Sequence, residues 1–78
     1  MNVASELRAA QRALAWNVLE GRRVRKFTVE AASFEAGLAP RHWSAIEAGQ
    51  SNPTLSTIVR VAVALRVDIP ALFAPVGR

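Results

Sequence analysis

Glycine and proline divide the second half of the sequence into short segments, and this spacing constrains the fold more than any other feature. Gly37 and Pro40 form one break, and Gly49 and Pro53 form the next. Glycine suits the left-handed residue that follows a helix, and proline suits the first position of a new helix. Between the breaks, apolar residues recur at helical spacing, without the alternation typical of a strand. The sequence therefore predicts an all-α chain of short helices.

Cap and turn residues place the expected helices. The first is the longest, from about residue 4 to residue 25, and either Asn2 or Ser5 is a suitable N-cap. Gly21 leaves its end open, because glycine costs a helix about 1 kcal/mol relative to alanine. Shorter helices are expected at 28–36, 40–48, 54–65 and 68–73, with Thr28, Thr54 and Asp68 as the N-caps of the first, third and last of these.

The apolar residues of these helices indicate how they pack. In the helix expected at 54–65, the inward face carries Leu55, Ile58, Val59, Ala62 and Leu65. No repeat, linker or low-complexity stretch divides the 78 residues. We therefore expect residues 1–78 to form a single domain, a compact five-helix bundle with an extended first helix.

Composition narrows the possible functions. The sequence has no cysteine and one histidine, so neither a disulfide framework nor a metal site is expected. No residues form a recognisable pair of nucleophile and base, and we expect neither enzyme activity nor a cofactor. The formal net charge of +4 favours polyanionic partners, nucleic acid above all.

Two further absences bear on location. No apolar run approaches the roughly 18 residues that cross a bilayer. The first residues also lack the basic start, apolar centre and small-residue cleavage site of a signal peptide. We expect a cytoplasmic protein without a membrane partner.

The helix expected at 40–48 has two distinct faces. Trp43 and Ile46 lie on one side and should be buried. Arg41, Ser44 and Ala45 lie on the other side, followed one turn later by another alanine. Small side chains let a helix enter the major groove, and an arginine can make a bidentate contact with guanine. An ordinary solvated helix can carry the same residues, so this helix alone leaves both interpretations open.

The order and spacing of several short motifs resemble one known family. The motifs are Phe27-Thr28, Ala36-Gly37-Leu38, Trp43-Ser44-x-Ile46-Glu47-x-Gly49, Asn52-Pro53-Thr54-Leu55, Val61-Ala62-x-x-Leu65 and Leu72-Phe73. From residue 18 to residue 73, the chain looks like the phage-repressor-like (Cro/cI, or Xre) helix-turn-helix family. The resemblance implies a bundle of the lambda-repressor-like DNA-binding type, with its helix-turn-helix at residues 28–48.

The resemblance also implies roles for individual residues. The residues at the base-reading positions are Arg41, Ser44 and Ala45. The residues at positions that contact the DNA backbone are Thr28, Gln50, Ser51 and Asn52. His42 flanks the recognition face, where it either contacts DNA or is simply solvated. Arg22 and Glu47 match a structural ion pair between the first and third helices.

The sequence departs from the family pattern at several positions. Val29 replaces a glutamine that contacts phosphate, and Ala39 replaces a serine or threonine cap. Smaller residues at 21 and at 32–33 remove core volume, which Phe34 and Trp43 are expected to refill.

A two-fold operator with inverted repeats requires a dimer. We expect a homodimer whose interface contains Val63, Val67, Ile69, Leu72 and Phe73. A competing surface lies on the first helix and contains Leu7, Trp16 and Leu19.

Two functions remain open at this point. The first is sequence-specific binding of double-stranded operator DNA by a transcription regulator, as a repressor or autoregulator. The alternative is an antitoxin or other protein-interaction module, whose main partner is another protein such as a toxin. Fold does not decide between them.

Overall fold

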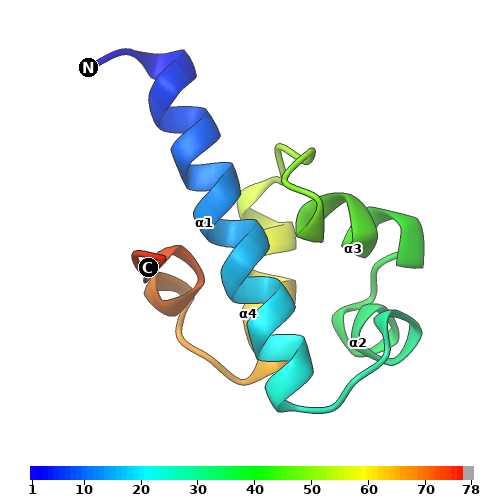
Figure 1. The fold of residues 1–78 in the computed structure, drawn as a ribbon. Helices are drawn as coiled ribbons and strands as arrows, with labels where there is room; N and C mark the ends of the chain where they lie inside the picture. The colour runs from blue at the N-terminus through cyan, green and yellow to red at the C-terminus, as the bar shows by residue number, and fades with distance from the viewer. Residues whose placement is uncertain (77–78) are drawn as a thin grey trace.

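The computed structural model describes residues 1–76 and contains four α-helices and one 3-10 helix (Figure 1). They are α1 (Val3–Val24), α2 (Val29–Ala36), α3 (Pro40–Glu47), α4 (Leu55–Leu65) and η1 (Ile69–Phe73). Helix α1 packs against α3, α4 and η1, while α2 packs against α3 and α4. The described residues contain no strand. The predicted all-α bundle with an extended first helix is therefore confirmed, except that the fifth helix is 3-10 rather than α.

Helix α1 continues through the glycine that left its end open in the sequence. Asn2 is the N-cap, and its Oδ1 accepts a hydrogen bond from the Ser5 N–H at 2.8 Å. A Cβ atom at Gly21 would lie 3.0 Å from Leu65 Cδ1. The absence of a side chain at Gly21 therefore lets α1 and α4 approach closely, and this packing offsets the low helix propensity of glycine.

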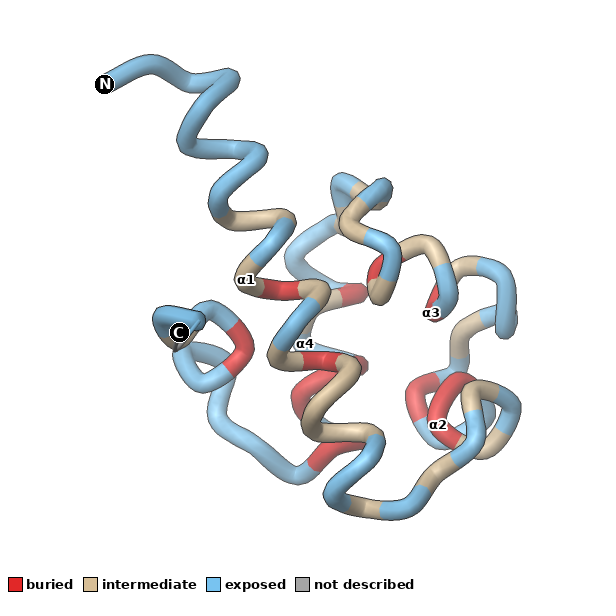
Figure 2. Tube along the Cα trace, in the orientation of Figure 1, coloured by how far each residue is buried: buried red, intermediate tan, exposed pale blue. Residues whose placement is uncertain are grey.

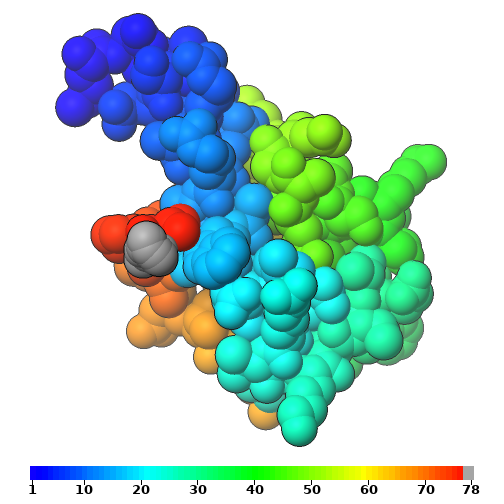
Figure 3. Space-filling view, viewed as in Figure 1, coloured from blue at the N-terminus to red at the C-terminus, as the bar shows by residue number. Residues whose placement is uncertain are grey.

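The first turns of α1 project beyond the rest of the molecule. They are exposed in Figure 2 and stand out as the blue end of the space-filling view in Figure 3. Burial in α1 begins at Leu14 and includes Val18, whereas Leu7 on the same stripe is 39 % exposed. The apolar stripe of α1 thus continues to a residue that the rest of the molecule covers only in part.

The core lies where α1 to α4 and η1 meet. Its largest fully buried side chains are Val18, Ser33, Trp43, Ile46, Val61, Leu65 and Leu72. Trp43 supplies core volume as expected, but Phe34 does not, because its side chain is 83 % exposed. Helix α2 turns Ala32, Ser33 and Ala36 inward, which places Phe34 on the opposite side. The prediction that Phe34 refills the core is wrong.

Helix α4 buries part of the expected stripe: Ala62 and Leu65 are buried and Ile58 is partly buried, as predicted, but other residues of this helix are buried as well. Its buried residues are Thr57, Val61, Ala62, Ala64 and Leu65. Leu55 is 71 % exposed and Val59 is 39 % exposed, which corrects the prediction for both. Helix α4 contacts α1, α2 and η1, so its neighbours decide which sides are covered. Because apolar residues occur on most sides of this helix, their periodicity did not identify all of the buried ones.

The short helix η1 is attached to α1 by Asn17. The side-chain amide nitrogen of Asn17, Nδ2, donates to the carbonyl oxygens of Leu72 at 3.1 Å and Ala74 at 2.9 Å, and also to that of Ala13 within α1. Asp68 precedes η1, but its side chain makes no capping hydrogen bond, contrary to prediction. Leu72 is 1 % exposed and belongs to the chain's own core. It is therefore not available for a subunit contact, which corrects its assignment to the dimer interface.

Candidate nucleic-acid interface

A tight turn joins α2 to α3. Gly37 caps the end of α2 and has φ 70° and ψ 33°, the left-handed conformation that glycine adopts without strain. The Leu38 N–H donates to the Ser33 carbonyl at 2.9 Å, which closes the end of the helix. A Cβ atom at Gly37 would also lie 2.8 Å from Arg60 Nη1. The backbone conformation therefore calls for glycine in this turn, whereas the end of the flexible Arg60 side chain could move aside.

Helix α3 separates its buried and exposed residues as the sequence predicts. Trp43 and Ile46 are 0 % and 2 % exposed, and they anchor the helix to the core. Arg41 and Ser44 are exposed on the other side, and Ala45 is half-buried beside them. The helix thus presents a narrow outer face of small side chains with an arginine at its N-terminal end. Contact of these three residues with DNA bases stays a prediction.

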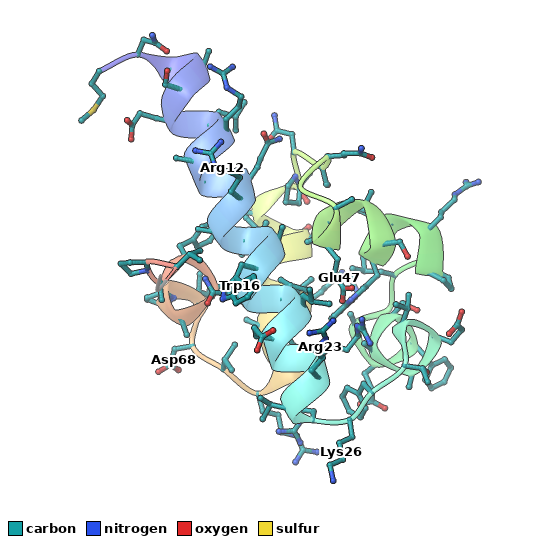
Figure 4. All side chains as sticks on the ribbon, viewed as in Figure 1. Arg12, Trp16, Arg23, Lys26, Glu47 and Asp68 are labelled. Atoms are coloured by element: carbon teal, nitrogen blue, oxygen red, sulfur yellow. The ribbon has the colours of Figure 1, made fainter. Side chains whose placement is uncertain are left out.

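Glu47 attaches the end of α3 to α1. Its carboxylate accepts hydrogen bonds from Arg22 Nε at 2.6 Å and from Arg22 Nη2 at 3.0 Å. Arg22 Nη1 donates to the Phe27 carbonyl at 2.9 Å, which also fixes the turn between α1 and α2. The hydrogen bond to Glu47 raises the pKa of Arg22, since it stabilises the charged guanidinium. The structure thus contains the ion pair that the resemblance implies. Figure 4 shows Glu47 at the end of α3 that faces α1.

The indole of Trp43 completes this cluster. Trp43 Nε1 donates to Glu47 Oε2 at 2.6 Å. The carboxylate therefore holds both the arginine of α1 and the buried tryptophan one turn earlier on its own helix. The sequence carried a signal for this contact, because residues four apart face each other on a helix. The helical pattern alone predicted Trp43 only as an apolar core residue.

The residues expected at the DNA backbone come from elements on either side of α3. Thr28 caps α2, and its Oγ1 accepts a hydrogen bond from the Ala31 N–H at 3.0 Å. Gln50 and Asn52 are exposed in the loop after α3, whereas Ser51 in that loop and His42 on α3 are half-buried. In Figure 1, α2 lies below α3 and this loop lies above it. The arrangement flanks the outer face of α3 with polar groups.

The loop after α3 presents backbone donors. Gly49 begins it with φ 73°, and the Gln50 N–H donates back to the Ala45 carbonyl at 3.0 Å. Within the described part of the chain, the N–H groups of Ser51 and Asn52 donate no hydrogen bond. Backbone N–H groups without a partner in the protein are suitable donors to phosphate, especially close to the start of a helix such as α4.

Two side-chain amides of α1 form hydrogen bonds that the sequence did not predict. Asn17 holds η1, as described above, and Gln11 Nε2 donates to the Ser51 carbonyl at 2.8 Å. Their acceptors are backbone carbonyls that lie 40 or more residues away along the chain. Since every residue has a carbonyl, no sequence pattern marks such a contact. Only the folded structure identifies it.

Metal-binding clusters and membrane-spanning helices are absent from residues 1–76. These residues hold no group of three or more His, Cys, Asp or Glu side chains that could bind a metal ion. None of the described helices is both long and apolar enough to cross a membrane.

Known proteins share this architecture. The family model described as helix-turn-helix matches residues 20–72. The restriction-modification controller protein C.AhdI from Aeromonas hydrophila has a similar structure, with a TM-score of 0.77 and 27% identity, over 81% of this chain and 96% of that one. The hypothetical transcription factor NHTF from Neisseria is also similar, with a TM-score of 0.81 and 30% identity, over 85% of this chain and 76% of that one. No curated protein matches the sequence.

The family match begins near the end of α1 and reaches η1, so it includes every element around the turn between α2 and α3. It covers well over half of the chain. It also contains the buried face of α3, the left-handed glycine at the turn, and the ion pair between Arg22 on α1 and Glu47 on α3. The chain belongs to the phage-repressor-like (Cro/cI, Xre) helix-turn-helix family of DNA-binding proteins.

Proposed function

We propose that this protein is a transcription regulator that binds operator DNA with helix α3 in the major groove, as a repressor or autoregulator. The observation that carries the proposal is the division of α3 into two faces. Trp43 and Ile46 hold the helix in the core, while Arg41 and Ser44 remain exposed. A helix fixed in this way presents its outer residues to base edges without reorganisation.

The flanking groups support the same mode of binding. The cap of α2 at Thr28 and the loop residues Gln50, Ser51 and Asn52 offer hydroxyl, amide and backbone donors. Contacts of this kind bind phosphate oxygens and set the register of the protein on the duplex, while base contacts provide selectivity. Arg41, Ser44 and Ala45 are the residues we assign to base contact, and His42 is a further candidate for phosphate.

The relatives favour a regulator over other roles for the fold. C.AhdI is described as a restriction-modification controller protein, and NHTF as a hypothetical transcription factor. We infer that the present chain also controls transcription. We also infer that it binds inverted repeats as a homodimer, since a two-fold dimer places two recognition helices about one DNA turn apart.

A protein partner, such as a toxin, is the second candidate function. The observation in its favour is Phe34, an aromatic side chain that is 83 % exposed on α2. Single exposed apolar side chains are common on protein surfaces, but an exposed aromatic residue can also anchor a contact with another protein. In this interpretation DNA contact is secondary or absent, so the DNA-binding experiment below separates the two functions.

The test is selection of binding sites in vitro from random duplex DNA, followed by affinity measurements on the selected site. We expect an inverted repeat, and an affinity that falls steeply as salt rises, because phosphate contacts release counterions. Arg41→Ala should lose about 1–3 kcal/mol of binding free energy and relax selectivity at one base pair in each half-site. The matched control is Arg8→Ala, which removes the same charge from an exposed position on the projecting part of α1.

The control variant should keep the selectivity of the parent, whatever its effect on affinity. A protein that selects no sequence would exclude the proposed function and favour the protein-interaction role. An Arg41→Ala variant with unchanged affinity and selectivity would exclude the assignment of this residue.

A further inference from the structure

We propose that Gln11, on α1, positions the loop after α3 so that the loop can contact DNA phosphates. The inference rests on the proposed DNA-binding function and adds to it a residue outside the family match, which begins at residue 20. It also gives a role to the N-terminal half of α1, which contributes little to the core. Gln11 is thus a positioning residue, acting through the loop and not on DNA directly.

The first observation is a single hydrogen bond between distant parts of the chain. Gln11 Nε2 donates to the Ser51 carbonyl oxygen at 2.8 Å, and the bond is partly buried. Within the described residues, no other hydrogen bond joins residues 51–53 to another element. The loop is therefore held at its middle by one side chain of α1.

The second observation is that the loop packs along the same part of α1. A small, largely apolar cavity separates them, with Leu7, Ala10 and Leu14 on the side of α1 and Asn52 and Pro53 on the side of the loop. The start of the loop also passes close to α1. A Cβ atom at Gly49 would lie 3.9 Å from Ala15 Cβ and 4.0 Å from the Gln11 carbonyl oxygen.

The direction of the hydrogen bond determines its consequence. Gln11 uses the carbonyl of Ser51 and so holds one side of that peptide toward α1. The amide donors of the loop, at Ser51 and Asn52, remain without partners in the described chain. An ordered set of backbone donors binds phosphate better than a mobile one, because the cost of ordering the loop is met before DNA arrives.

The test uses the Gln11→Met variant, which keeps the length of the side chain and removes its donor. Affinity is measured for two duplexes, one with the site selected in vitro and one with a scrambled sequence of the same composition. We expect a loss of about three- to ten-fold on both duplexes, since a phosphate contact carries no sequence information. The matched control is Ala9→Met, which places the same side chain at an exposed position of the same helix. It should bind both duplexes as the parent does.

Two further measurements separate positioning from stability. The affinities are measured well below the unfolding temperature of each variant, so a general loss of stability would leave them unchanged. In an Asn52→Pro background, which lacks the backbone N–H of Asn52, the effect of Gln11→Met should shrink, because one of the donors that it positions is already lost. Additive effects would overturn the inference.

The remaining outcomes also decide the question. Equal affinities for the parent and Gln11→Met, or an equal loss in Ala9→Met, would overturn the role of Gln11 while leaving the proposed function intact. A loss confined to the selected site would overturn it as well, since it would indicate base contact. If the parent binds neither duplex, both the proposed function and this inference fail. The affinity of the parent therefore distinguishes this outcome from failure of the inference alone.

Discussion

At the scale of single residues, Glu47 joins α1 to α3 next to the candidate interface. Its carboxylate accepts hydrogen bonds from Arg22 on α1 and from the indole of Trp43. The side chains of Arg22 and Glu47 are only 17% and 11% exposed, so water can replace few of these contacts. Charged groups that are partly buried depend strongly on their partners. The orientation of α3 therefore depends on this carboxylate as well as on the buried Trp43 and Ile46.

We predict that Glu47→Gln lowers the free energy of unfolding by about 1–3 kcal/mol, because the guanidinium of Arg22 loses its anionic partner. Urea denaturation followed by circular dichroism measures the change. Glu35→Gln is the matched control, since Glu35 is an exposed carboxylate on α2 and should change stability by less than about 0.5 kcal/mol. Equal stability of the Glu47→Gln variant and the parent would contradict this role.

The sequence predicted some of these side-chain contacts and missed others. The resemblance indicated the pair of Arg22 and Glu47. The contact between Glu47 and Trp43 also agrees with their spacing, because residues four apart on a helix face each other. Gln11 and Asn17 could not be identified, because their acceptors are backbone carbonyls of distant segments. Phe34 was assigned to the wrong side of its helix, since residue size alone does not reveal which face is buried.

At the scale of elements, α3 begins without a side-chain cap. Ala39 is the N-cap residue, with φ −68° and ψ 144°, and it makes no capping hydrogen bond. Pro40 follows at the first helical position, where its fixed φ suits the helix and its missing N–H is no loss. By contrast, Thr28 and Thr54 cap α2 and α4 through their hydroxyl groups. The start of α3 is thus the weakest of these three.

We predict that Ala39→Ser stabilises the protein by about 0.5–2 kcal/mol, because the new hydroxyl can accept a hydrogen bond from the first turn of α3. Thermal unfolding measures the gain. Ala9→Ser, inside α1 on an exposed face, is the control and should cost a few tenths of a kcal/mol, about the difference in helix propensity. If both serine variants lose stability, the start of α3 is not limited by its cap.

At the scale of the whole molecule, two apolar surfaces compete for the expected subunit contact. Val63 is 68 % exposed, while Val67, Ile69 and Phe73 are each 37–38 % exposed. We propose these four residues as the dimer face, without the buried Leu72. The other surface lies on α1, where Trp16 is 46 % exposed. The two surfaces approach each other at Phe73, which lines the same small cavity as Leu7.

We predict that replacing both Val63 and Ile69 with glutamate makes the protein monomeric, because burying two charges in an apolar interface is costly. Sedimentation velocity measures the mass in solution, and circular dichroism checks that the helices remain. Glutamate at both Leu7 and Trp16 is the matched pair on the competing surface and should leave the dimer intact. The opposite result would move the interface to α1.

The sequence by itself determined the order of helices, the left-handed turn at Gly37 and the two faces of α3. These are local properties, set by backbone conformation, caps and spacing within one turn or two. Only the tertiary structure decided which side of α4 is covered, that Gly21 lies within α1, that Phe34 is exposed, and that Gln11 holds the loop after α3. Each of these depends on which surface another element presents at that point, and no neighbouring residue in the sequence encodes it.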